Sequence, residues 1–287
     1  MKTFHTLVLA LVVLVGGLTA SSAEAGKSLK VLVIAGGCCH DYATQSKLLK
    51  QGIEARINAE VTVAFNPSRG TDATFKIYES DDWAKPFDVI LHDECSASVT
   101  DKKYINRILN AHKSGTPAVN LHCAMHSYRW GDFRKLVKPG ADNHAWFEMI
   151  GLQSTGHGPQ SPIDIKYVDA NHPITIGFDN WTTINEELYN NIEVYEGTKV
   201  IATGTQVQKP RKRDLKKNPN AKPKTSTAAI IWLNEYGPKK TRVFSTSLGH
   251  NNDTVADARY LDLVVRGLLW TTGNLSPDGR ATNGYAK

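Results

Sequence analysis

Residues 116–126 read TPAVNLHCAMH, a short apolar run that leads directly into imidazole and thiol side chains. An apolar run of this length between turn residues is typical of a buried β-strand. Two histidines and a cysteine follow it, at His122, Cys123 and His126. In open parallel sheets, ligands bind just beyond the carboxyl ends of the strands. The stretch therefore predicts a strand that delivers chemically active side chains to a ligand site.

The segments around this stretch alternate between strand and helix patterns. Residues 29–36 (LKVLVIAG) and 87–95 (FDVILHDEC) are apolar runs typical of buried strands, and residues 60–66 alternate as a half-exposed strand does. Residues 43–57 and 100–115 have apolar side chains at helical spacing, and the second segment opens on a capping threonine and closes on a glycine. The alternation predicts an α/β fold: a flavodoxin-like, doubly wound, mostly parallel sheet with helices on both faces.

The second half of the chain departs from this alternation. Strand patterns cover residues 161–175 and 197–207, and residues 226–250 read as two strands around a turn. A final helix is predicted over residues 253–273, where apolar residues recur at helical spacing. Because no repeat or long linker interrupts the pattern, we expect residues 26–287 to form a single domain with an elaborated second half.

The first 25 residues have the pattern of a secretory signal peptide. Lys2 supplies a positive start, an apolar run covers residues 6–18, and the small-residue sequence AEA at 23–25 is a cleavage site. An uncleaved membrane anchor is the alternative, but the run is shorter than the roughly 20 residues that a spanning helix needs. We therefore expect export to the periplasm or the extracellular medium, without a stable membrane anchor.

The net charge of +6 comes from one segment. Residues 209–224, KPRKRDLKKNPNAKPK, contribute +7, so the rest of the chain has a net charge of −1. Three prolines and the lack of apolar periodicity predict a mobile surface insertion. The segment could contact an anionic polymer or lipid headgroups. Because it has no aromatic residues to stack on bases, we expect no nucleic-acid partner.

Four cysteines, Cys38, Cys39, Cys95 and Cys123, would enter an oxidising compartment on export. A bridge between the adjacent Cys38 and Cys39 would be strained. A bridge between Cys95 and Cys123 is favoured if their strands are neighbours. The sequence alone leaves the pairing open.

Polar side chains follow four of the predicted strands. They are Cys38, Cys39, His40 and Asp41 after the first strand, His92, Asp93, Glu94 and Cys95 after the third, His122, Cys123 and His126 after the fourth, and His250, Asn251 and Asn252 after a late strand. A single histidine of this kind is more often a hydrogen-bonded core residue. Four such groups at one sheet edge favour a binding or catalytic site. Two later segments could close over this edge with His144, His157, Glu186, Glu187 and Tyr189.

Taken in order, these motifs resemble the ThuA-like (trehalose utilisation) family, whose fold is similar to that of class I glutamine amidotransferases. The resemblance rests on the glycines before His40, NLHCAMHSY at 120–128, NHPITIG at 171–177, EELY at 186–189 and SLGH at 247–250. It covers roughly residues 29–275. The family implies carbohydrate metabolism, with trehalose and related disaccharides as substrates and a partner sugar dehydrogenase that makes a keto-sugar. The implied substrate is therefore a glycoside or a keto-sugar.

The resemblance does not extend to glutaminase chemistry. The amidotransferase nucleophile is a cysteine at a sharp strand-to-helix turn, and its place falls on His122, with Cys123 one residue later. The histidine–acid pair of that family falls on His250 and Asn252, so the acid is missing. Because the reaction needs a thiol, a base and an orienting acid together, we expect no glutaminase activity.

His40, His122, His250 and Glu187 are the expected catalytic residues. The three imidazoles, with an open position, would suit zinc or a similar divalent metal and an activated water, although no HExxH-like spacing is present. Metal-free acid–base chemistry on a sugar is the alternative. The expected substrate-binding residues are His126, Asp93, Tyr189, His157 and Asn251, and Trp130, Trp146 and Trp181 could stack on sugar rings or serve as core aromatics.

Ordinary glycosidase chemistry is less attractive, because adjacent Glu186 and Glu187 would point apart on regular secondary structure. The sequence instead favours an exported lyase, isomerase or hydrolase that acts on a sugar. A non-catalytic sugar-binding module with a degenerate amidotransferase-like site is the alternative. A polyanion-binding protein that works through residues 209–224 is a third hypothesis.

Overall fold

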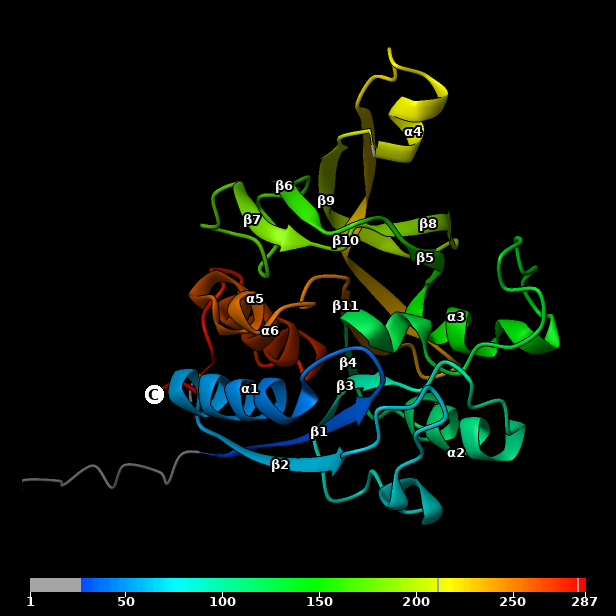
Figure 1. Ribbon diagram of the computed structural model, residues 1–287. Helices are drawn as coiled ribbons and strands as arrows, with labels where there is room; N and C mark the ends of the chain where they lie inside the picture. Colours follow the sequence, from blue (N-terminus) through cyan, green and yellow to red (C-terminus); the bar gives the residue numbers. More distant parts are fainter. Residues whose placement is uncertain (1–26, 211, 283) are drawn as a thin grey trace, which may run out of the picture.

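The computed structural model describes residues 27–210, 212–282 and 284–287. The predicted signal peptide therefore lies outside the described residues. In the part of the chain that the structure describes, no helix is both long and apolar enough to cross a membrane. Figure 1 shows a central sheet with helices packed against it and a long hairpin that projects away from the body.

A nine-stranded sheet forms the centre of the molecule. Its strands are, in spatial order, β2 (Ala59–Asn66), β1 (Leu29–Gly37), β3 (Val89–Cys95), β4 (Ala118–Leu121), β11 (Thr241–Thr246), β10 (Lys224–Tyr236), β9 (Lys199–Gln208), β6 (Ser161–Tyr167) and β7 (Trp181–Glu186). A separate two-stranded sheet pairs β5 (Leu152–His157) with β8 (Tyr189–Val194).

The sheet has a parallel half and an antiparallel half. Strands β2, β1, β3, β4 and β11 pair in parallel, and the pairings from β11 through β10, β9 and β6 to β7 are antiparallel. All residues of β3 and β4 are buried, which explains why these strands read as continuous apolar runs. The predicted α/β, doubly wound architecture is confirmed, and the antiparallel half is its elaboration.

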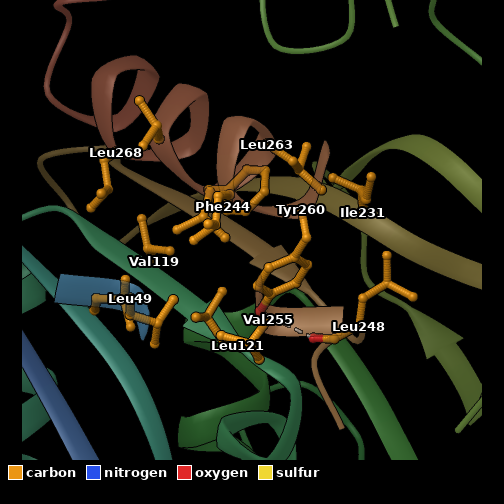
Figure 2. Close-up of a cluster of buried hydrophobic side chains, with 14 of the residues drawn as sticks. Leu49, Val119, Leu121, Ile231, Phe244, Leu248, Val255, Tyr260, Leu263 and Leu268 are labelled. Carbon is orange, nitrogen blue, oxygen red and sulfur yellow. Dashed lines mark hydrogen bonds between the residues drawn. The ribbon is translucent and has the colours of Figure 1, made fainter. Parts of the chain in front are cut away.

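Helices cover the two faces of the sheet separately. On one face lie α1 (Tyr42–Arg56), α5 (Asn252–Ala256) and α6 (Ala258–Thr271), and on the other lie α2 (Lys102–Lys113) and α3 (Ala145–Ile150). Figure 2 shows the core under the first group, where Leu49 of α1 and Leu268 of α6 pack around Phe244 of β11. Burial of each such side chain contributes about 1.5–3 kcal/mol to stability.

Two predicted elements are shorter than their patterns indicated. The helix expected over residues 253–273 is divided into α5 and α6, because Asp257 adopts an extended conformation (φ −63°, ψ 130°) and caps α6 by accepting from the backbone N–H of Arg259. The strand expected over residues 161–175 ends at Tyr167. The following turns are held by the Thr175 hydroxyl, which donates to the carbonyl of Asp169.

The basic segment 209–224 forms the tip of the hairpin between β9 and β10. The segment expected as a mobile surface insertion contains a short helix, α4 (Lys212–Lys217), and β10 begins at its last residue, Lys224. No side chain of α4 is buried. The helix therefore rests on local backbone bonds rather than on an apolar face, which is why periodicity did not reveal it.

Candidate functional site

A sharp turn after β4 carries His122. β4 lies between β3 and β11, and a 3₁₀-helix, η2 (His122–His126), follows it directly. The φ angle of His122 is +40°, a conformation that residues other than glycine rarely adopt. Such strain persists only where the surrounding structure enforces it, and it is common at functional sites. The strand-to-helix elbow expected from TPAVNLHCAMH is thus present, with His122 at its apex.

Three strand ends bring histidines together at this elbow. His40 follows β1, His122 follows β4, and His250 follows β11. The ring centroid of His40 lies 4.7 Å from that of His122 and 4.7 Å from that of His250, and the latter two are 5.4 Å apart. Ligand nitrogens from the three rings all lie within 4.8 Å of one another.

Each of these imidazoles has one buried nitrogen that makes no well-aligned hydrogen bond among the described residues: Nδ1 of His40, Nε2 of His122 and Nδ1 of His250. The nitrogens of His122 and His250 face the carboxylate of Glu187. The opposite nitrogen of His122, Nδ1, lies 2.7 Å from the carbonyl oxygen of Ser247. That carbonyl can only accept, so the proton of neutral His122 is on Nδ1 and the lone pair is on Nε2. Backbone geometry thus prepares His122 to ligate a cation through Nε2.

A carboxylate, Glu187, lies beside this cluster. Its Oε2 is 3.5 Å from Nε2 of His122 and 3.2 Å from Nδ1 of His250, and its Oε1 is 3.3 Å from Nδ1 of His157. Burial alone would raise the pKa of Glu187, but the imidazoles of His122 and His250 outweigh it and hold the pKa well below its ordinary value. Glu187 is therefore ionised at neutral pH.

Glu186, the last residue of β7, has other partners than Glu187, which follows the strand. Both oxygens of Glu186 accept backbone N–H groups of the turn after β11, from His250 at 3.1 Å and from Asn251 at 3.2 Å. The two glutamates consequently have different roles. Glu186 holds the turn that presents His250, and Glu187 faces the histidines.

The histidines of the cluster differ in charge state. Burial, followed by the neighbouring imidazoles of His122 and His250, lowers the pKa of His40 to about 3, so His40 is neutral with a free lone pair. Burial also acts to lower the pKa of His250, but the carboxylates of Glu187 and Glu186 raise it more, and the net shift is upward. Of the three rings, His250 therefore takes up a proton more readily than His40 does.

Tyr189 and two further histidines extend the cluster. The His126 ring stacks on Tyr189 with centroids 4.2 Å apart, and its Nε2 lies 2.9 Å from the hydroxyl oxygen of Ser154. Burial lowers the pKa of His126 well below its ordinary value, so this ring is neutral. The side chain of His157 is 44% exposed. It lies between Glu187 and solvent.

Not every polar strand end contributes to this cluster. His92 and Glu94 project toward α2, where His92 Nδ1 is 2.9 Å from Glu94 Oε1 and His92 Nε2 is 3.0 Å from Nε2 of His112. Tyr78 and Tyr128 donate to the same Glu94 oxygen. This fully buried network supports the core rather than an open site.

Lowering the pH is expected to weaken the fold in part through His112. Burial, with His92 beside it, lowers the pKa of His112 to about 3, whereas an unfolded histidine has a pKa of about 6.5. Between these values the unfolded chain binds the extra proton, so the free energy of unfolding falls with falling pH by up to about 1.4 kcal/mol per unit. Urea unfolding at several pH values should give a shallower slope for His112→Asn than for the wild type. Equal slopes would contradict this account.

The cysteines do not pair as the sequence favoured. Cys38 and Cys39 form a disulfide between neighbouring residues, and Cys95 and Cys123 are free and buried. The disulfide is possible because the turn after β1 has an unusual backbone, with Cys39 at a φ of +86°. A hydrogen bond with Cys95 and then burial raise the pKa of the Cys123 thiol. Cys123 is therefore a poor nucleophile, in agreement with the expected lack of glutaminase chemistry.

Other predicted site residues lie apart from the histidines. Asp93 is only 4% exposed, and burial raises its pKa well above the ordinary value. Trp146 is buried, and its indole N–H donates to the carbonyl of Ala124, so it is a core aromatic. The ring of Trp181 is covered by the guanidinium of Arg259, 4.0 Å from its centroid. Two more of the predicted residues also lie apart from the cluster: His144 packs on Tyr195, and Trp130 packs at the edge of the core.

A cleft of about 600 Å³ opens beside His40 and His250. Two of its residues, Gln160 and Asn185, had not been singled out in the sequence. The amide nitrogen of Gln160 lies 2.7 Å from Nε2 of His250, and the Asn185 carbonyl accepts from the side chain of Asn251 at 2.6 Å. Both belong to the antiparallel half, which no local pattern places at this edge. Asn251, predicted to bind substrate, also lines this cleft.

The sequence profile of the ThuA family, described as trehalose utilisation, matches residues 30–271. The chain belongs to the ThuA family. The resemblance stated from the motifs is thereby confirmed. No curated protein matches the chain.

Solved structures support the family's fold. A ThuA-like protein from Parabacteroides merdae is 17% identical with a TM-score of 0.56, and the match covers 90% of this chain and 98% of that one. A ThuA-like protein from Bacteroides uniformis is 14% identical with a TM-score of 0.57, covering 91% and 99%. A β-galactosidase from Bacillus circulans sp. alkalophilus is 11% identical with a TM-score of 0.50, covering 88% of this chain and 32% of that one. At these identities the likeness is one of fold.

Proposed function

We propose that this ThuA protein is a metal-dependent enzyme that acts on a keto-sugar, with His40, His122 and His250 holding a divalent metal such as zinc. The observation that carries the proposal is the convergence of three imidazole nitrogens within 4.8 Å of one another. Among the described residues, that of His40 has no hydrogen-bond partner, and those of His122 and His250 face the carboxylate of Glu187. Leaving a buried polar group unsatisfied costs about 1–3 kcal/mol. Three imidazole nitrogens facing one another are most simply explained by a shared ligand.

The chemistry of these groups fits zinc. Catalytic zinc sites have three protein ligands, often histidines, and keep one position open. The carbonyl of Ser247 orients the His122 ring in the way that outer partners orient metal ligands. Glu187 supplies negative charge beside the centre, which lowers the cost of placing a cation there.

The family description, trehalose utilisation, supports a sugar as the substrate, and we infer a keto-sugar because the chemistry proposed here needs an acidic C–H. A ketone acidifies the neighbouring C–H, and a bound metal would polarise the ketone oxygen as a Lewis acid. Glu187 takes the proton from carbon, and His157 passes it to solvent or back. In an isomerisation, that proton ends on the former carbonyl carbon, and the proton of the neighbouring hydroxyl group moves to the former carbonyl oxygen. In an elimination, the electron pair of the C–H bond forms a C=C bond, the C–O bond to the glycosidic oxygen breaks, and the proton taken from carbon is passed to the departing oxygen, which leaves as an alcohol. A sugar dehydrogenase would supply the keto-sugar, and export through the signal peptide expected from the sequence would put the reaction outside the cytoplasm.

Elemental analysis of the mature protein is the direct test. The wild type, purified without chelators and supplied with zinc, is expected to hold about one equivalent of metal. Added zinc at 1,000 times its dissociation constant should raise the free energy of unfolding by about 4 kcal/mol. A His40→Ala/His250→Ala variant should hold none and show no such increase. Metal-free wild type, or equal metal in both proteins, would leave acid–base chemistry without a metal or plain sugar binding as the function.

A further inference from the structure

The cleft beside the histidines has walls from three separate segments. It is lined by Cys39, His40 and Asp41 after β1, by Gln160, Ile184 and Asn185 from the antiparallel half, and by His250, Asn251, Asn252 and Asp253 after β11. Its volume of about 600 Å³ lies within the range of small-molecule sites. Because His40 and His250 line it, a molecule in the cleft would lie against the proposed metal centre.

We propose that this cleft binds the sugar and selects an uncharged, unphosphorylated one. The inference rests on the proposed function in one respect: His40 and His250, which line the cleft, are proposed metal ligands. Its own content is the ligand's charge and position, which the metal proposal does not determine. Two kinds of observation carry it, the polar groups on the walls and the signs of their charges.

The polar groups are held in place by one another. The Asn252 amide donates to Oδ2 of Asp41 at 2.9 Å, and this bond joins the turn after β1 to the turn after β11. Asn251 is held by the backbone carbonyl of Asn185 at 2.6 Å. Amides and carboxylates supply the donors and acceptors that hydroxyl groups need. Groups already ordered lose less entropy when a ligand binds, which favours recognition of a polyhydroxylated molecule.

Apolar surface accompanies these groups. Ile184 is 48% exposed although its side chain is large and apolar, and Cys39 presents an exposed part of the disulfide to the same cleft. A sugar ring has both hydroxyl edges and C–H faces. The mixture of amides with exposed carbon and sulfur therefore matches a sugar better than a fully polar ligand such as a free phosphate.

The charges on the walls disfavour an anionic sugar. Two carboxylates, those of Asp41 and Asp253, line the cleft, and Asp253 is exposed at its rim. No lysine or arginine lines this cleft within the described chain. A phosphate carries a charge of about −1.5 to −2 at pH 7 and would meet these carboxylates. The neighbouring cleft around His157, by contrast, is lined by Lys209, Lys222 and Lys224.

The test compares trehalose with trehalose 6-phosphate, which differ by one phosphate. Calorimetric titration should show that trehalose binds at least about 10-fold more tightly to the protein as purified. The same order should hold after chelator treatment, which removes any contact between phosphate and metal. Tighter binding of the phosphate ester in the chelator-treated protein, or no binding of trehalose, would overturn the inference.

Two variants locate the site. Asn252→Ala should weaken trehalose binding about 10-fold, and Asp253→Lys, at the exposed rim, should reduce or reverse the preference against the phosphate ester. Asn106→Ala is the matched control, because Asn106 lies in a separate groove along α2. If Asn106→Ala weakens trehalose binding as much as Asn252→Ala does, the sugar does not bind in this cleft. Metal content of the protein as purified separates the two proposals. If the protein holds no metal as purified but prefers trehalose, only the proposed function is refuted. If it holds metal as purified but prefers trehalose 6-phosphate once the chelator has removed that metal, only this inference is refuted.

Discussion

Replacing His122 by alanine is expected to abolish metal binding and to lower turnover of a keto-disaccharide, prepared by oxidation of trehalose, by at least about 1,000-fold. His122 stands at the apex of the elbow after β4, and its Nδ1 is anchored on the Ser247 carbonyl at 2.7 Å. Removing the ring leaves two of the three proposed ligands, His40 and His250, whose ring centroids lie 4.7 Å apart. Kinetics and elemental analysis of the same preparation measure both effects.

The control for this variant is His144→Ala, which also removes a buried imidazole. His144 packs on the ring of Tyr195 with centroids 4.6 Å apart, away from the cluster. It should lower stability but keep metal and turnover. Trehalose binding by His122→Ala should stay within a few-fold of the wild type, because His122 does not line the sugar cleft. Full turnover by His122→Ala would show that the elbow histidine is not part of the chemistry.

The parallel half of the fold could be predicted because its central strands are buried on both faces. β3 opens on an apolar run and β4 is apolar apart from Asn120, and the helix between these two strands, α2, carries apolar residues at helical spacing. The break at Asp257 was missed because a local cap overrides the continuing periodicity of α5 and α6. Strand pairing in the antiparallel half depends on contacts distant in sequence, which periodicity does not specify.

The site was predicted only as far as strand ends determine it. Parallel topology places His40, His122 and His250 at one edge, and the sequence pattern was sufficient for that. The sequence pattern did not determine on which face of the sheet each side chain lies. His92 and Glu94 are two residues apart on β3, so they share a face and enter the network under α2. Gln160 reaches His250 from the antiparallel half, and no pattern within its own segment indicated this contact.

Replacing Glu187 by glutamine is expected to separate metal binding from catalysis. The amide keeps the size of the side chain but cannot accept a proton from carbon, so turnover of the keto-disaccharide should fall by about 100-fold or more. Metal content should stay near that of the wild type, since the three histidine nitrogens are unchanged. This combination differs from the His122→Ala result, in which both quantities are lost.

Glu186→Gln is the matched variant for this test, because the two glutamates are adjacent but have different partners: Glu186 accepts backbone N–H groups, and Glu187 lies against imidazole rings. Glu186 accepts the backbone N–H groups of His250 and Asn251, so its amide would place an N–H against an N–H and loosen that turn. We expect a loss of about 1–3 kcal/mol in the free energy of unfolding and a smaller loss of turnover than for Glu187→Gln. If Glu187→Gln instead lost its metal and kept residual turnover only in proportion to the metal retained, Glu187 would be a ligand, and the proton would have to move to another group, of which His157 is the nearest with exposure to solvent.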